Sequence, residues 1–426
     1  MPLTPDHVGV VGYGQGTVGN NPGSTSIGSP PACRAGLLVI SSRMPLSKLQ
    51  ARFYYPELDS IRFFLFCGVW VYHTLPREEG PYSAHHVPMP LAVGITSIIK
   101  ASMCSLDVFF IISAFLITGL LLREKELKGG VDLKAFYTRR LLRIWPLYFF
   151  VIGLAGLLSV IDRSQVLGWV CTLCYLLFAG NWVFALGDFP PARIIWPLWS
   201  VSFEEQFYLL WPLVLRWASK RIIYGAAIGL LVVGSFARLI LLLEHTGAHR
   251  MWFNSFVRVD SIAYGILLAV CLHGRDAPRF RLPTRVALLL MGGTAWVIVG
   301  QFCRLLDPEA TPIGVMIGYP LMSLGGVAIF LSVFGATQDG AAFLKNSGLV
   351  YLGNITYGLY AYHYLGLRLS GYVFVTRHQH LRTQTFYLFC ALAITFLLAA
   401  ASFKWLETPF LRMKQRFTYV PSGARI

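Results

Sequence analysis

Charged side chains are scarce in this sequence, and their scarcity is the first constraint on its class. Only 13% of the 426 residues are charged, whereas 55% are hydrophobic and 14% are aromatic. A soluble globular domain of ordinary composition carries about 25% charged residues. The composition therefore predicts a protein of the lipid bilayer.

Three further patterns are missing from the sequence. No His and carboxylate cluster has ligand spacing on one helix, so no metal site is predicted. No internal repeat is visible, and no segment alternates as the strand of a membrane barrel would. The N-terminal stretch lacks the charged start, apolar run and small-residue cleavage site of a signal peptide. These absences leave an all-α, polytopic transmembrane helix bundle as the predicted fold class.

Basic residues outnumber acidic ones, and the formal net charge is +16. They are spread between apolar segments and do not form one stripe, so no nucleic-acid partner is expected. Short cytoplasmic loops of membrane proteins carry an excess of Lys and Arg. The densest basic stretch, residues 123–143, is therefore predicted to lie on the cytoplasmic side of the membrane.

Eleven apolar segments follow one another along the chain. They cover residues 60–75, 104–122, 141–161, 166–184, 197–218, 222–243, 258–273, 284–303, 313–335, 349–372 and 384–403. The basic loops all reach the cytoplasm only if one segment between residues 141 and 218 fails to cross, and we nominate residues 166–184 as re-entrant or interfacial. The prediction is about ten spans in the cytoplasmic (inner) membrane, with both termini cytoplasmic.

The two ends of the chain differ from this apolar region. Residues 1–43 are rich in Gly, Pro and Ser and are predicted to be a disordered extension. Met44 precedes a short basic lead into the first apolar helix, so translation beginning there is a second interpretation. Residues 54–416 form the predicted membrane domain, and residues 417–426 a cytoplasmic tail.

Arg62 and His73 lie eleven residues apart inside the first apolar segment. At about 100° and 1.5 Å per residue, both side chains project from one helix face, about 16 Å apart. An arginine in the middle of a membrane helix costs on the order of 2.5 to 3.5 kcal/mol, so it requires a polar partner or an aqueous path. The pair therefore indicates a functional site, with a structural polar pair as the alternative.

Other polar side chains interrupt the apolar segments. Asp107 is interpreted as orienting a base or as capping its helix, and the consecutive Glu204 and Glu205 as mainly structural. His363 is interpreted as a hydrogen-bonded core residue, and Glu407 as the partner of a cytoplasmic arginine. The candidate set is Asp59, Arg62, His73, Asp107, Ser113, Arg139, Arg140, Arg143, Glu204, Glu205, Tyr208, His363 and Glu407.

The order of these motifs resembles that of the integral-membrane acyltransferases of the acyltransferase 3 type. The resemblance runs from about residue 54 to residue 416. It rests on Leu58 to Arg62 with ten residues before His73, the stretch Asp107 to Phe115, Arg139-Arg140 to Tyr148, Trp199 to Trp211, and Glu407-Thr-Pro409. Five motifs in order on separate helices make this resemblance specific.

The resemblance implies transfer of an acyl group, commonly acetyl, from acyl-CoA to a hydroxyl group, often on a surface carbohydrate. It implies that His73 is the catalytic histidine and that Arg62 is the other half of the family's signature. Asp107 is the third candidate catalytic residue. It also implies that Arg139, Arg140 and Arg143, the last two above all, bind the phosphates of coenzyme A, because guanidiniums suit phosphate. A purely topogenic role of these three arginines is the alternative. A histidine could take the hydroxyl proton or carry the acyl group as an acyl-imidazole.

Three other interpretations remain open. The acceptor could be a small secondary metabolite such as a macrolide instead of an envelope glycan. Buried Arg, His and carboxylate side chains also line the substrate paths of transporters and flippases. A non-catalytic membrane partner would need none of the polar residues for its activity.

Overall fold

The computed structural model describes residues 52–187, 189–307, 310–338, 341–371 and 381–420. Its helices are numbered from α2. They are α2 (Pro56–Thr74), α3 (Gly80–Ser83), α4 (Met89–Ala101), α5 (Ser105–Lys128), α6 (Leu133–Ile161), α7 (Trp169–Leu176), α8 (Gly180–Leu186), α9 (Leu198–Trp217), α10 (Lys220–Leu243), α11 (Ala248–Phe253), α12 (Val259–Leu272), α13 (Leu282–Ile298), α14 (Pro312–Val333), α15 (Ser347–Asn354), α16 (Thr356–Leu369), α17 (Leu381–Ser402) and α18 (Thr408–Lys414). The described residues form no β-sheet, so the prediction of an all-α fold is confirmed.

Six helical stretches of the described chain are long and apolar enough to cross a membrane. They are Met89–Lys128, Leu133–Ile161, Lys220–Leu243, Leu282–Cys303, Pro312–Val333 and Gln384–Phe417. The first is more extensive than the sequence predicted, because α4 leads directly into α5. Helices α2, α9 and α16 are not among the six, and these are the helices that carry Arg62, Glu204 and His363. Part of the polar site thus lies on helices outside the six, whereas Asp107, Arg140 and Glu407 lie on three of the six.

Residues 166–184 do not form one spanning helix. They fall into α7 and α8, of eight and seven residues, which are too short to cross a bilayer. The turn between them reaches into the bundle, since the Tyr148 hydroxyl of α6 donates to the Tyr175 carbonyl at 2.7 Å and the Gln206 amide of α9 donates to the Phe178 carbonyl at 2.9 Å. This geometry fits the predicted re-entrant segment, whereas ten spans stay a prediction.

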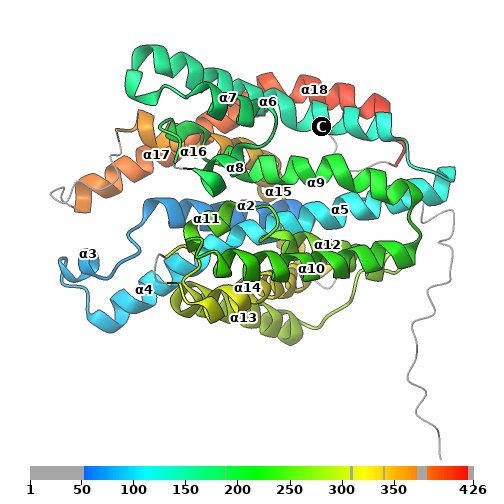
Figure 1. Cartoon of the computed structure of the whole chain (residues 1–426), viewed down its shortest axis with the longest axis horizontal. Coiled ribbons are helices and arrows are strands. Elements are labelled where there is room, and N and C mark those ends of the chain that lie inside the picture. Colours follow the sequence, from blue (N-terminus) through cyan, green and yellow to red (C-terminus); the bar gives the residue numbers. More distant parts are fainter. Residues whose placement is uncertain (1–51, 188, 308–309, 339–340, 372–380, 421–426) are drawn as a thin grey trace, which may run out of the picture. The chain divides into compact units, whose positions relative to one another are not determined.

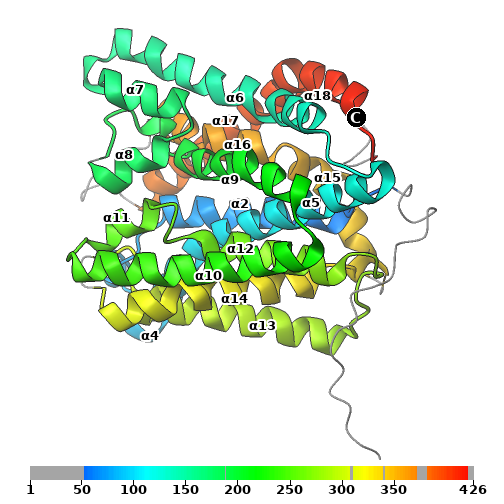
Figure 2. The same ribbon diagram turned by 45° about the vertical axis from the view of Figure 1, so that its right-hand side comes forward.

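The helices form three groups that run side by side. Figures 1 and 2 show α2, α5, α9, α12 and α16 in the middle, α10, α13 and α14 on one side, and α6, α17 and α18 on the other. The middle group is closely packed: α5 packs along α12, and α2 packs against α15. Gly353 of α15 allows this approach, because a Cβ there would overlap the Asp59 carbonyl of α2. The site residues are thus carried by central helices with fixed neighbours.

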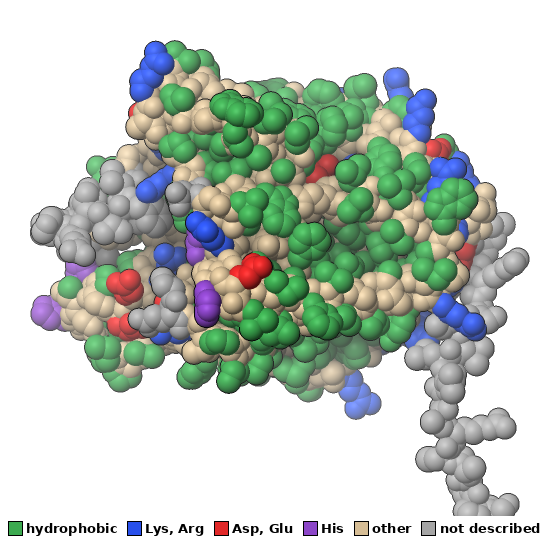
Figure 3. All heavy atoms as spheres, in the orientation of Figure 1, with side chains coloured by type: hydrophobic (Ala, Val, Ile, Leu, Met, Phe, Trp, Pro, Cys, Tyr) green, Lys and Arg blue, Asp and Glu red, His purple; other side chains and the backbone are tan. Residues whose placement is uncertain are grey.

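Basic residues from distant parts of the sequence meet at one end of the bundle, which we call the basic end. Lys125 at the end of α5 donates to the carbonyls of Leu215 and Ala218 at 2.9 and 2.8 Å. Lys220, at the start of α10, pairs with Glu126 at 2.9 Å. The opposite end, where α2 finishes, we call the His73 end. Figure 3 shows hydrophobic side chains over much of the visible surface between two ends that carry Lys and Arg, as expected for a membrane protein.

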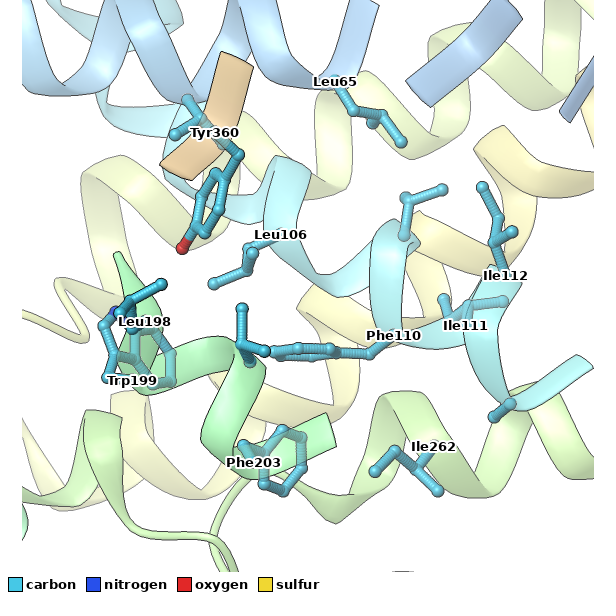
Figure 4. Close-up of a cluster of buried hydrophobic side chains, with 14 of the residues drawn as sticks. Leu65, Leu106, Phe110, Ile111, Ile112, Leu198, Trp199, Phe203, Ile262 and Tyr360 are labelled. Carbon is cyan, nitrogen blue, oxygen red and sulfur yellow. The ribbon is translucent and has the colours of Figure 1, made fainter. Parts of the chain in front are cut away.

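The core between the middle helices is aromatic and aliphatic. Figure 4 shows Phe110 of α5 beside Phe203 of α9, with the Tyr360 hydroxyl of α16 turned toward the start of α9. The rings of Phe110 and Phe203 lie 4.8 Å apart at 71°, an edge-to-face geometry favoured by aromatic pairs. The Tyr360 hydroxyl is 2.8 Å from Ser200 Oγ. An apolar core with isolated polar contacts therefore holds the site helices in place.

Two predicted segments lie partly or wholly beyond this description. Residues 1–43, and the choice between Met1 and Met44, fall outside the described residues. Of the predicted tail, residues 417–420 are described and pack onto the bundle: Val420 is buried with Phe53 and Leu120, and the Tyr419 hydroxyl donates to Asp132 at 2.8 Å.

Candidate functional site

His73 meets a second histidine from the other end of the sequence. Its Nδ1 lies 3.0 Å from Nε2 of His363 on α16. The ring centroids are 5.1 Å apart and the ring planes differ by 9°. Since the contact between the two nitrogens accounts for most of the centroid separation, the rings lie edge to edge in nearly one plane. That is the arrangement of a hydrogen bond through the ring nitrogens.

The partners of His363 decide which nitrogen of His73 carries a proton. His363 is fully buried, and its Nδ1 lies 2.5 Å from the Tyr360 carbonyl, which can only accept. In the neutral pair, His363 Nδ1–H donates to that carbonyl, so its Nε2 accepts from His73 Nδ1–H. The Nε2 of His73 is then left with its lone pair. The arrangement can therefore supply a base at the end of α2.

Arg62 lies three turns before His73 on the same helix, as the sequence predicted. Its Nη1 pairs with Asp59 Oδ1 at 2.5 Å, and both side chains are largely buried. Each of the two residues has its own partner, Asp59 for Arg62 and His363 for His73, and the choice between a functional site and a structural polar pair stays a prediction. Asp59 and Arg62 mark one end of α2, and His73 and His363 mark the other.

The arginines of α6 differ in what they contact. Arg139 is 6% exposed and fully engaged, with Nη2 3.0 Å from Glu124 and Nη1 donating to the Phe417 carbonyl at 2.7 Å. The Arg143 side chain is not covered by the rest of the protein, and it interacts electrostatically with Arg62 and Glu407 from other helices. Arg140 is half-buried over the rings of Phe136 and Tyr208, and its Nε has no hydrogen-bond partner among the described residues.

The helix that carries these arginines is held at its first turn. Asp132 caps α6, accepting from the Ala135 backbone N–H at 2.9 Å. That hydrogen bond, together with the one from Tyr419, lowers the pKa of the Asp132 carboxyl below its ordinary value. The charged cap fixes the start of α6 at the basic end.

Polar side chains of α5 and α9 fill the space between the two ends of α2. The Tyr208 hydroxyl donates to Glu204 at 2.6 Å and is in close contact with the Ser113 hydroxyl. Glu205 accepts from Trp145 at 3.3 Å, and its other oxygen is buried without a partner among the described side chains. The two glutamates thus contact different groups, as the angle between consecutive helix positions predicts.

Asp107 forms a buried ion pair beside this space. Its Oδ2 is 2.8 Å from Arg258 Nη2, both side chains are 1% exposed, and Ser323 donates to its other oxygen at 3.4 Å. The structure therefore places Asp107 against Arg258 and gives it no contact with His73, and a catalytic role for Asp107 stays a prediction. Asp260 pairs with Arg238 at 2.5 Å, so Arg258 and Asp260 belong to two separate ion pairs.

Glu407 lies where α17 meets α18 and is buried. It accepts from Ser402 at 3.2 Å and interacts electrostatically with Arg143. The predicted arginine partner is thus nearby without forming a direct ion pair with it.

Together these residues form a polar path through the bundle. It consists of Arg140, Arg143, Arg62 and Asp59 at the basic end, then Glu204, Tyr208 and Ser113, and finally Ser200, Tyr360, His363 and His73. Direct contacts join Asp59 to Arg62, Glu204 to Tyr208 and Ser113, and Ser200 through Tyr360 and His363 to His73. Among the described residues, these groups are connected to one another by electrostatic interactions only, as between Arg62 and Glu204 and between Glu204 and Tyr360. Of these, Ser200 and Tyr360 were not predicted from the sequence. A Ser and a Tyr within aromatic helices give no signal of this kind, because their role depends on a contact 160 residues apart.

Comparison with known proteins agrees with this architecture. The acyltransferase domain family matches residues 55–404. The chain belongs to the acyltransferase 3 family. Similar proteins include the peptidoglycan O-acetyltransferase OatA of Listeria monocytogenes, 24% identical over 84% of this chain and 56% of that protein. The O-acetyltransferase OatA of Staphylococcus aureus is 25% identical over 88% of this chain and 60% of its own length.

The acyltransferase 3 chain thus spans about 60% of the length of these relatives. No solved structure matches it. The family resemblance stated from the motifs is confirmed, and the helical fold with several apolar, membrane-suited helices agrees with it.

Proposed function

We propose that the protein is a membrane O-acyltransferase that moves an acetyl group from acetyl-CoA to a hydroxyl of a cell-envelope glycan. The observation that carries the proposal is the hydrogen-bond chain from the Tyr360 carbonyl through His363 to His73. It leaves His73 Nε2 as a base at one end of a polar path. The similar O-acetyltransferases, one named for peptidoglycan, support the acetyl group and the glycan.

The donor is assigned to the basic end. Coenzyme A carries several phosphate charges, and guanidiniums bind phosphate through paired N–H groups. Arg143 is exposed there, Arg140 has an unused buried Nε, and Lys414 of α18 interacts electrostatically with both. Arg139 contributes less, because Glu124 and Phe417 already occupy its guanidinium.

The reaction follows from the tautomer of His73. The acceptor hydroxyl gives its proton to Nε2 as its oxygen attacks the thioester carbonyl, and the resulting imidazolium returns the proton to the departing thiolate of coenzyme A. The carbon–sulfur bond breaks and an ester bond forms. In the two-step alternative, Nε2 attacks the thioester carbonyl, the carbon–sulfur bond breaks, and the coenzyme A thiolate leaves and takes a proton from water. The acceptor hydroxyl then attacks the acyl-imidazole, the carbon–nitrogen bond breaks as the ester forms, and the hydroxyl proton passes to water. In both, His363 Nε2 accepts the Nδ1–H of His73 and stabilises the positive charge.

The orientation rests on the basic residues. The loops predicted to be cytoplasmic, including those with Lys125, Arg139 and Lys220, meet at the basic end. Under the positive-inside rule that end faces the cytoplasm. The proposal is therefore about ten spans in the cytoplasmic membrane with both termini inside, acetyl-CoA entering at the basic end, and the glycan at the His73 end.

One assay tests the function. The purified full chain is given labelled acetyl-CoA and envelope glycans, and wild type is compared with His73→Ala and with the control His85→Ala, an exposed histidine outside the path. A general base contributes about 10²- to 10⁴-fold, so His73→Ala should lose transfer by that factor while His85→Ala retains it. Unchanged transfer in His73→Ala, or uptake of the glycan without acetylation, would overturn the proposal.

A further inference from the structure

His73 lies in the middle of a row of aromatic rings that ends in an arginine on each side. In order, the row is Arg77, Tyr72, His73, Tyr364, Trp196 and Arg193, with successive separations of 4.8, 5.6, 5.3, 5.8 and 5.4 Å. We call these six residues the aromatic arc. They come from α2 and the loop after it, from α16, and from the turn Arg193–Ile195 with the residue after it. Segments from three distant parts of the sequence thus converge on His73.

The two terminal guanidiniums of the arc have no carboxylate partner among the described residues, and both are exposed. Two other arginines at the His73 end are paired, Arg304 with Asp307 at 2.6 Å and Arg368 with Asp162 at 2.9 Å. Arg77 and Arg193 are instead stacked over the rings of the arc. A stacked guanidinium keeps its N–H edge available for an anion.

The rings between the arginines are accessible and held in place. Tyr72, Tyr364 and Trp196 are each partly exposed, and the Trp196 indole N–H donates to the Pro190 carbonyl at 2.7 Å. Ordered, partly exposed aromatic faces suit the apolar C–H face of a sugar ring, while polar groups around them fix its orientation. The arc therefore combines a surface for sugar rings with two positive charges, on both sides of the proposed base.

We propose that the aromatic arc is the acceptor site and that it binds an anionic carbohydrate. This proposal rests on the proposed function. The sugar ring lies on Tyr364 and Trp196, its hydroxyl reaches His73 Nε2, and a carboxylate or phosphate of the same glycan binds Arg77 or Arg193. Guanidiniums hold either anion through paired N–H groups. The charge of the acceptor, and not its sugar ring alone, then determines the affinity.

The test compares three acceptors with the purified full chain and labelled acetyl-CoA. They are a neutral N-acetylglucosamine disaccharide, the same disaccharide carrying a uronate, and the same disaccharide carrying a 6-phosphate. The variants are Arg77→Gln and Arg193→Gln, and the control is Arg163→Gln, an exposed arginine outside the arc. A charge-assisted hydrogen bond contributes about tenfold or more, so at least one arc variant should raise KM for an anionic acceptor by about that factor. KM for acetyl-CoA should not change.

The two anionic acceptors distinguish a carboxylate site from a phosphate site, and a preference for either supports the proposal. Equal KM for the neutral and both anionic acceptors in wild type would overturn it, as would arc variants that behave like Arg163→Gln. If the arc proposal fails in this way but acetyl transfer to the neutral disaccharide is still lost in His73→Ala, the proposed O-acyltransferase function stands. If no acceptor is acetylated, equilibrium binding of the three disaccharides is measured instead. Tighter binding of the uronate or phosphate disaccharide than of the neutral disaccharide, lost in the double variant Arg77→Gln/Arg193→Gln, supports the proposed acceptor site. Equal binding of all three disaccharides rejects it.

Discussion

The hydrogen bond between His73 and His363 leads to a specific prediction for substitutions of His363. In His363→Leu a side chain of similar size fills the buried site without offering an acceptor, so His73 Nδ1–H loses its partner at 3.0 Å. In His363→Gln the amide oxygen can accept in place of Nε2. Activity should therefore fall in the order wild type, His363→Gln, His363→Leu.

The size of the effect follows from the charge that develops on His73. During proton transfer its ring becomes an imidazolium, and a hydrogen bond to a charged group contributes about 1.5–3 kcal/mol. At about 1.4 kcal/mol per factor of ten, His363→Leu should lower kcat by about 10- to 100-fold. KM for acetyl-CoA should stay at its wild-type value, because the donor is assigned to the other end of the polar path.

The assay is transfer of labelled acetyl from acetyl-CoA by the purified full chain, with kcat and KM measured separately for each variant. Thermal unfolding in detergent serves as the control for folding, and His85→Ala as the control for a histidine outside the path. Wild-type kcat in a folded His363→Leu protein would refute the reasoning. Equal losses in the Gln and Leu variants would show that the hydrogen bond is not the cause.

Three further predictions concern residues around the path. Arg143→Gln should raise KM for acetyl-CoA about tenfold through lost phosphate contacts, whereas Arg139→Gln should mainly lower the unfolding temperature because it leaves Glu124 unpaired. Asp107→Leu should destabilise the protein by about 3–5 kcal/mol, because it leaves Arg258 buried without its partner. The double variant Asp107→Leu/Arg258→Met should recover most of that loss. Thermal unfolding of the single and the double variant checks both expectations. Asp132→Ala should cost about 1 kcal/mol at pH 7. Since the folded pKa of Asp132 is depressed, this difference is present above its ordinary pKa of 3.8 and should narrow as the pH falls through the folded value.

The helices and the first half of the site could be predicted from local pattern. Arg62 and His73 share a helix face because their spacing is close to three full turns. Residues 166–184 were nominated as non-crossing because the basic loops agree in orientation only if one segment between residues 141 and 218 fails to cross. Such inferences depend on neighbours in the sequence, which periodicity describes well. Helix α4 (Met89–Ala101) was missed, because the second apolar segment was predicted to begin at residue 104.

The partners of the site residues could not be predicted in this way. His363 lies 290 residues from His73, and no periodic pattern links them. Its aromatic surroundings indicated a buried residue, which is correct, but not that the buried hydrogen bond would be to His73. Likewise, the sequence indicated only that Asp107 lies near the start of a helix. Its ion pair with Arg258, 151 residues away in the sequence, could not be predicted from local pattern. Long-range contacts of this kind depend on how the helices pack.

The central claim is that the polar path joins a donor at the basic end to an acceptor at the His73 end. The most direct test uses proteoliposomes in which the chain has one known orientation, with labelled acetyl-CoA at the basic end and an anionic glycan only in the compartment facing His73. The account predicts acetylated glycan in that compartment, lost in His73→Ala. Product formed only when both substrates share one compartment would contradict it.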